Sequence, residues 1–348
     1  MKIKTWMTAL FAAVSTVEAS AASPLDIPYQ EMPLVKVNQA DTMILSDCPE
    51  YAAVYGILAE GTIPKGKGRL YYYHVNQTGR PARLVVYGTS DRKQQVKVTR
   101  TLRGEPSQSY IPTGKTLSFR EVTSVRQEVK EVTVEKGKRT ILYEENPKGI
   151  DREDLVSGMV EIETRAPVRL GTAMLPDKDD VEKNLGKASP LPPDTHEMRG
   201  TFPMHLYFEN ESWDISEGAR EVDLGSAESH TPFFVSGTDE LNLLHRENTG
   251  NYGITCHFTI HSRGEGAYDV YLNPNGGSFE GTIEIGQNKK ALRIYETKRP
   301  GRRWFGQDTI YDYMKLGTWE AGKDLFIKFI PPGACYFPIR FLFVPHGK

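Results

Sequence analysis

Short runs rich in aromatic and β-branched residues recur through most of the chain, and this pattern limits the fold more than any other feature. The run RLYYYHV at residues 69–75 is one example. In residues 95–101, Val96 and Val98 alternate with polar residues, which is the two-residue period of a half-buried strand. Clusters of Gly, Pro and Asn separate the runs about every 8–12 residues, a spacing typical of antiparallel sandwiches and barrels. The sequence therefore predicts an all-β fold with no helix longer than about two turns.

The predicted strands form two sets, separated by a polar, proline-bearing segment at residues 176–200. The first set covers residues 69–75, 83–87, 95–101, 128–135, 140–143, 156–163 and 168–174. The second set covers residues 204–208, 221–224, 232–235, 253–260, 267–272, 281–285, 291–295, 324–330 and 339–344. A chain of 348 residues is long enough for two domains. We therefore expect two antiparallel β-sandwich-like domains, residues 22–175 and 201–348, joined by a linker at residues 176–200.

The first 21 residues have the three-part layout of a secretory signal peptide. Lys2 and Lys4 precede an apolar stretch at residues 5–17, and small residues follow at positions 19–21. The apolar stretch is too short to span a bilayer, which takes about 20 residues. We expect cleavage between Ala21 and Ala22, export to the periplasm, the cell envelope or the medium, and no transmembrane segment in the mature chain.

Cysteine is scarce for an exported protein, with only Cys48, Cys256 and Cys335. A scaffold that depended on disulfides would carry more cysteines, in an even number. Cys256 lies in a predicted strand and Cys335 follows a Pro-Pro-Gly turn, so these two could pair. The alternative is that the cysteines are buried free thiols.

Several motifs of this chain resemble one recurring module. They are GKGRLYYYHVNQTGRPARLVVYG, the NYG of NTGNYGITCHFTI, VYLNPNGGSFEGTIEIG, and LGTWEAGKDLFIKFIPPGACYFPIRFLFVP. The module is similar to one in exported bacterial proteins known as copper amine oxidase N-terminal domain-containing, or stalk-domain, proteins. The valine-rich stretch that marks the amine oxidase-like segment of that family is not found here, so the resemblance implies no copper chemistry. It implies a cell-envelope protein.

The turn residues of these motifs have a structural interpretation and an alternative one. Gly250 and Gly253 flank a reversal before a strand, and Pro331-Pro332-Gly333 forms a turn between the last two strands. Glycine at such positions could also allow the backbone to approach a ligand closely.

The familiar catalytic motifs are absent from the sequence. It contains no C-x-x-C or H-E-x-x-H zinc motif, no G-x-S-x-G nucleophile elbow and no Walker phosphate loop. His257 and His261 are four residues apart in a predicted strand, about 13 Å, which is too far for one metal ion. We expect these histidines to face solvent, and we expect no metal site and no cofactor. The net charge of -2 also argues against a nucleic-acid binder.

A basic and aromatic loop at residues 298–306 is the candidate binding site. Arg299, Arg302, Arg303 and Trp304 lie within six positions of one another. Guanidinium groups and an indole could hold an anionic envelope polymer by charge and by stacking. The alternative is a solvated loop whose Trp304 folds back onto the sandwich.

These observations favour an exported cell-envelope or surface protein with a non-enzymatic binding or structural role. Its partner would be an anionic envelope polymer or another surface protein. The first alternative is an exported hydrolase that acts on cell-wall glycan or peptide, and the second is a stalk or spacer module. A cleft lined by paired carboxylates, or by His beside Ser or Cys, would favour the hydrolase.

Overall fold

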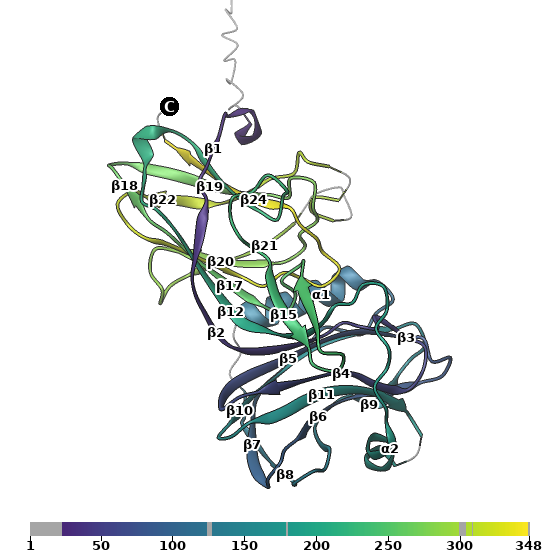
Figure 1. Cartoon of the computed structure of the whole chain (residues 1–348). Coiled ribbons are helices and arrows are strands. Elements are labelled where there is room, and N and C mark those ends of the chain that lie inside the picture. Colours follow the sequence, from purple (N-terminus) through teal and green to yellow (C-terminus); the bar gives the residue numbers. More distant parts are fainter. Residues whose placement is uncertain (1–22, 124–126, 179, 299–303, 308, 347–348) are drawn as a thin grey trace, which may run out of the picture.

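The structure is a computed structural model of the chain, and it describes residues 23–123, 127–178, 180–298, 304–307 and 309–346 (Figure 1). Strands dominate these residues, which confirms the predicted all-β fold. The predicted cleavage site between Ala21 and Ala22 lies outside the described residues. In the described part of the chain, no helix is long and apolar enough to cross a membrane.

One mixed sheet runs through both halves of the molecule and contains 13 of the described strands. Its main path follows, in spatial order, β21 (Arg293–Glu296), β20 (Thr282–Gly286), β23 (Leu325–Phe329), β17 (Thr255–Ile260), β12 (Arg199–Asn210), β2 (Leu34–Ser46), β5 (Gly66–Asn76), β10 (Leu155–Thr164), β7 (Gln94–Arg103) and β8 (Lys130–Val134). Three strands pair outside this path: β3 (Tyr51–Ala52) with β5, β15 (Val235–Asp239) with β12, and β16 (Leu244–Asn248) with β15. We call it the shared sheet.

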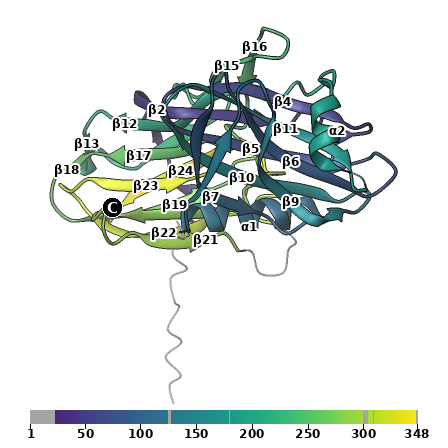
Figure 2. The ribbon, with the colours of Figure 1, turned by 90° about the horizontal axis from the view of Figure 1, so that it is seen from below.

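Two smaller sheets pack against the shared sheet and complete two sandwiches (Figures 1 and 2). The first consists of β4 (Gly56–Ile63), β11 (Val168–Pro176), β6 (Ala82–Thr89) and β9 (Thr140–Ile150). The second consists of β1 (Gln30–Glu31), β14 (Arg220–Leu224), β24 (Ile339–Pro345), β19 (Ala267–Asn273) and β22 (Met314–Glu320). Two short strands, β13 (Trp213–Asp214) and β18 (Ser262–Arg263), pair by themselves, and single 3₁₀ turns occur at Pro24–Asp26 and Ile215–Glu217.

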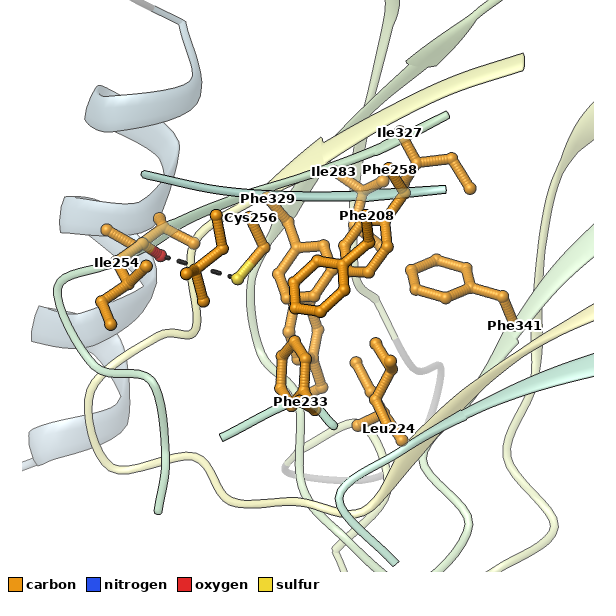
Figure 3. Close-up of a cluster of buried hydrophobic side chains, with 14 of the residues drawn as sticks. Phe208, Leu224, Phe233, Ile254, Cys256, Phe258, Ile283, Ile327, Phe329 and Phe341 are labelled. Carbon is orange, nitrogen blue, oxygen red and sulfur yellow. Dashed lines mark hydrogen bonds between the residues drawn. The ribbon is translucent and has the colours of Figure 1, made fainter. Parts of the chain in front are cut away.

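A ladder of phenylalanine rings forms the centre of the second sandwich (Figure 3). Phe208, Phe258 and Phe329 come from the adjacent strands β12, β17 and β23. The ring centroids of Phe208 and Phe258 are 5.3 Å apart, and those of Phe258 and Phe329 are 5.5 Å apart. The stacked rings of Phe208 and Phe258 lie opposite each other on β12 and β17, and their contact stabilises the register of this parallel pair.

The strand β2 joins the two halves of the chain. It pairs antiparallel with β12 over most of its length and parallel with β5 near its end. β12 in turn pairs parallel with β17, so the shared sheet departs here from the purely antiparallel pattern that we predicted. Parallel neighbours need a crossover connection, and these strands come from distant parts of the sequence. Independent folding of residues 22–175 and 201–348 stays a prediction. If the halves fold separately, β2 has to form without its pairing to β12.

A buried ion-pair network lies at the same junction. The Arg69 side chain is fully buried, and its Nη2 atom lies 2.7 Å from a carboxylate oxygen of both Glu121 and Glu161. Its Nη1 atom donates to the carbonyl oxygen of Gly253 over 2.7 Å. Arg100 pairs with the same two carboxylates. Two guanidinium groups thus neutralise two carboxylates, and Arg69 of the first half contacts the backbone of the second.

We expect a protease to cut the segment at residues 176–200 without separating the halves. Trypsin should cleave after the exposed Lys178, because exposed loops are the usual sites of nicking. The two fragments should then migrate together in native gel filtration, because β2 and β12 remain paired. Denaturant should be required to separate them. Separation under native conditions would show that the shared sheet contributes little to the association.

The predicted absence of longer helices is wrong. α1 (Tyr110–Val122) has 13 residues, and a shorter helix, α2 (Val181–Lys187), lies within the predicted linker. Pro112 and Gly114 are poor helix formers, so the sequence of α1 does not predict a helix. Packing accounts for it, because one face including Leu117 and Val122 is buried. Gly114 is needed there, since a Cβ atom would lie 2.2 Å from the carbonyl oxygen of Gly333.

All three cysteines are buried free thiols in this structure, so Cys256 and Cys335 are not joined. Cys256 lies in the second sandwich core beside Ile254 (Figure 3). The sulfur of Cys335 accepts a hydrogen bond from the backbone of Glu280 instead. Burial raises the pKa of both thiols above the ordinary value, to about 12 for Cys335.

Candidate functional site

A cavity of about 310 Å³ lies where the ends of β2 and β5 meet loops of the second half. We call it the Asp47 cavity. Asp47 and Glu50 border it from the segment that follows β2, and His196 borders it from the predicted linker. The rings of three tyrosines, Tyr71, Tyr73 and Tyr252, also border it.

Three motifs that the sequence marks as strands or turns converge on this cavity. The run at residues 69–75 contributes Tyr71 and Tyr73 from β5. The NTGNYG turn contributes Thr249 and Tyr252, and the Pro-Pro-Gly turn contributes Gly333 and the following Ala334. Ala334 and Asn251 both have left-handed backbone, with φ of 62° and 46°. Such strain in residues with a Cβ atom is often found at ligand sites.

Asp47 is a carboxylate with an unsatisfied oxygen. Its backbone N–H donates to the carbonyl oxygen of Met198 over 3.1 Å, which fixes the chain just after β2. The Oδ1 atom is shielded from solvent, and none of the described residues donates a hydrogen bond to it. Burial raises the pKa of the Asp47 carboxyl well above its usual range, and the nearby carboxyls of Glu50 and Asp194 raise it further.

Asp194 organises the acidic side of the cavity. One of its carboxylate oxygens accepts the backbone N–H of Glu50 over 2.7 Å, and the other accepts the backbone N–H of His196 over 3.0 Å. Burial would raise the pKa of Asp194, but these hydrogen bonds hold it below its ordinary value. Burial also raises the pKa of Glu50, against the opposing effect of His196. Three carboxyls therefore give this region a negative charge once they ionise.

Specific contacts fix the three tyrosines that border the Asp47 cavity. The Tyr252 hydroxyl donates to the carbonyl oxygen of Cys335 over 2.5 Å, which ties the NTGNYG turn to the last strand connection. Gly333 packs directly on the other two rings, and a Cβ atom there would lie 2.8 Å from the Tyr73 ring and 3.1 Å from the Tyr71 hydroxyl. Burial raises the pKa of all three phenols far above the ordinary value, so they remain neutral donors.

The structure describes one of the four residues of the predicted binding loop. Trp304 is half-buried and borders a neighbouring cavity of about 370 Å³, together with Tyr110 and Ala334. Arg299, Arg302 and Arg303 lie outside the described residues. Ala334 borders both cavities, so the cavity that Trp304 borders adjoins the Asp47 cavity, which the sequence did not indicate.

His257 and His261 have separate partners. The Nε2 atom of His257 lies 3.2 Å from Nδ1 of His205, and its ring stacks on Tyr207 at 4.5 Å. His261 instead pairs with Asp324 over 2.8 Å. Burial lowers the pKa of His257 to about 3, so its ring is neutral at ordinary pH. Within the described ranges, no group of three or more His, Cys, Asp or Glu side chains could hold a metal ion.

A larger depression of about 710 Å³ lies on the first sandwich, but Glu60, Arg139 and Arg169 on its border already have partners. Arg169 pairs with Glu60 over 3.3 Å. Arg139 donates to the carbonyl oxygens of Leu185 and Ala188 at the end of α2. The Asp47 cavity is the better candidate because Asp47, which borders it, has a carboxylate oxygen that accepts no hydrogen bond from the described residues.

Sequence reasoning did not single out Asp47, Glu50 or His196. The only local signal is the DCPE segment at residues 47–50, an acidic pair around a Cys-Pro step. No family model matches this chain, and no curated protein matches it. The resemblance to stalk-domain proteins therefore stays a prediction.

Proposed function

We propose that this protein is an exported cell-envelope binding protein that holds a cationic amine group in the Asp47 cavity. The observation that carries the proposal is the shielded Oδ1 atom of Asp47, which accepts no hydrogen bond from the described residues. Asp47 is half-buried, and a carboxylate oxygen that is shielded from water without a partner is costly, so an ammonium group that enters the cavity would supply hydrogen bonds and charge to this carboxylate. Export rests on the signal-peptide pattern at residues 1–21.

The surroundings of Asp47 favour a cation over an anion or a neutral group. Glu50 also borders the cavity, and the carboxylate of Asp194 accepts a hydrogen bond from the backbone N–H of Glu50. Tyr71, Tyr73 and Tyr252 also border the cavity, and an ammonium group that meets the face of a tyrosine ring is attracted by its electrons. An anionic ligand would face these carboxylates, so the anionic polymer expected from the loop is the poorer fit to this cavity.

The test is a comparison of ligands that differ only in charge. We expect butylammonium to bind the full chain, measured by titration calorimetry at pH 8. Its neutral isostere 1-butanol should bind at least about tenfold more weakly, because it supplies no charge to Asp47. Equal affinity for the two, or binding of butyrate instead, would refute the proposal.

A hydrolase remains the second candidate, because Asp47 and Glu50 both border the cavity and both have a raised pKa. A protonated carboxyl beside a second carboxyl is the arrangement that glycoside hydrolysis uses. Incubation with wall glycan, followed by an assay for new reducing ends, separates the two functions. Release of reducing ends that is lost in Glu50→Gln would favour the hydrolase.

A further inference from the structure

A second cavity adjoins the Asp47 cavity and differs from it in chemistry. We call it the Trp304 cavity. It measures about 370 Å³ and lies at the beginning of α1, between Tyr110 and Trp304. Gln108 and Ser109 add an amide and a hydroxyl group to its lining. It therefore offers aromatic surfaces and neutral hydrogen-bonding groups, and no carboxylate borders it in the described part of the chain.

The two cavities are adjacent along the surface. Ala334 borders both of them. The Tyr110 ring of the second cavity meets the Tyr73 ring of the first edge-to-face, with centroids 6.5 Å apart and an interplanar angle of 84°. Each cavity is at the lower end of the range of about 300–1,000 Å³ typical of small-ligand sites. A ligand longer than one unit could occupy both.

We propose that the two cavities are neighbouring subsites for an oligosaccharide of amino sugars. This inference rests on the proposed function, because the first sugar would place its ammonium group against Asp47. The next sugar would then lie in the Trp304 cavity. A sugar ring has apolar faces that pack on Trp304 and Tyr110, and hydroxyl groups that Gln108 and Ser109 can satisfy. The acidic and the aromatic cavity thus match two parts of one ligand.

A titration of the full chain with glucosamine and its β-1,4-linked disaccharide tests the inference. The disaccharide should bind about 3- to 10-fold more tightly than the monosaccharide, the range expected for one good aromatic contact. Trp304→Ala should remove this gain and leave glucosamine affinity within about twofold. The control Tyr311→Ala alters an aromatic side chain that is 73% exposed and borders neither cavity, and it should keep the gain.

The outcomes separate the inference from the proposed function. Glucosamine could bind through Asp47 while the disaccharide binds no more tightly, or while Trp304→Ala still binds the disaccharide more tightly than glucosamine. Either result would refute the two-subsite inference and leave the proposed function standing. If no amine binds, both fail. An affinity for the N-acetylated disaccharide equal to that for the amino disaccharide would refute the role of the ammonium group. A Trp304-dependent gain for trilysine over lysine, without one for the sugars, would assign the site to a peptide instead.

Discussion

Replacing Arg69 with methionine is expected to lower the midpoint of thermal unfolding by about 4–7 °C, corresponding to a loss of about 3–5 kcal/mol in the free energy of unfolding. The Arg69 side chain is fully buried between Glu121 and Glu161, and it also donates to the second half through Gly253. Methionine preserves much of the volume but leaves the buried carboxylate of Glu121 and the half-buried carboxylate of Glu161 with only Arg100 to neutralise them. Differential scanning calorimetry measures the effect.

Arg263→Met is the matched control, because Arg263 is 61% exposed and its ion pairs with Asp214 and Glu217 are loose. Exposed pairs contribute about 0–1 kcal/mol, so this variant should melt near the wild type. Thr255→Val provides a milder test, since it removes the hydrogen bond that the Thr255 hydroxyl accepts from Arg69 and the one that it donates to Glu121, and it should cost about 2 kcal/mol. Equal melting of Arg69→Met and Arg263→Met would show that the network does not hold the junction together.

Replacing Asp47 with asparagine is expected to weaken amine binding at least about 30-fold, because a cation loses its charged partner in a buried site. The same change should raise stability at pH 8 by about 1–2 kcal/mol, since a neutral amide costs less to bury than a carboxylate without a partner. Loss of binding together with a gain in stability is typical of a functional residue. Asp91→Asn, on an exposed turn, is the control for both measurements.

The stability gain should depend on pH in a direction that follows from the raised pKa of Asp47. Below the ordinary aspartate pKa of about 3.9, the carboxyl is protonated in the folded and unfolded states, and the gain should vanish. As the pH rises, the unfolded chain ionises first, so the wild type loses stability until the pH passes the raised pKa. The difference in melting midpoint between Asp47→Asn and wild type should therefore be near zero at about pH 3, small at about pH 4 and about 1–3 °C at pH 8. A larger difference at pH 4 than at pH 8 would contradict the assignment.

The sequence predicts most strands because their hydrophobic alternation is local, but it misses the strand that joins the halves. β2 contains the stretch Asn38–Asp41, whose Asn and Asp residues are common in turns, so its sequence does not predict a strand. In the structure Asp41 has φ of 54° within this strand. The strand forms because β12 and β5 pair with it from distant parts of the chain. α1 was missed for a related reason, since its Pro112 and Gly114 disfavour a helix and burial of one face stabilises it.

The candidate site could be predicted only in pieces. The aromatic run around Tyr71 and the turns around Tyr252 and Gly333 are visible as motifs, and glycine near a ligand was one interpretation of them. Their convergence was not visible, because it depends on the path of β2 and on the shared sheet. No local sequence pattern distinguishes Asp47 from the exposed acids of the chain, and only its surroundings in the fold raise its pKa.

A crystal structure of the protein soaked with butylammonium tests the central claim most directly. We predict that the amine nitrogen lies about 3 Å from a carboxylate oxygen of Asp47, the distance of a charge-assisted hydrogen bond, with the alkyl chain between the tyrosine rings. A soaked crystal in which Asp47 contacts only water or protein, with the amine bound elsewhere, would contradict the account.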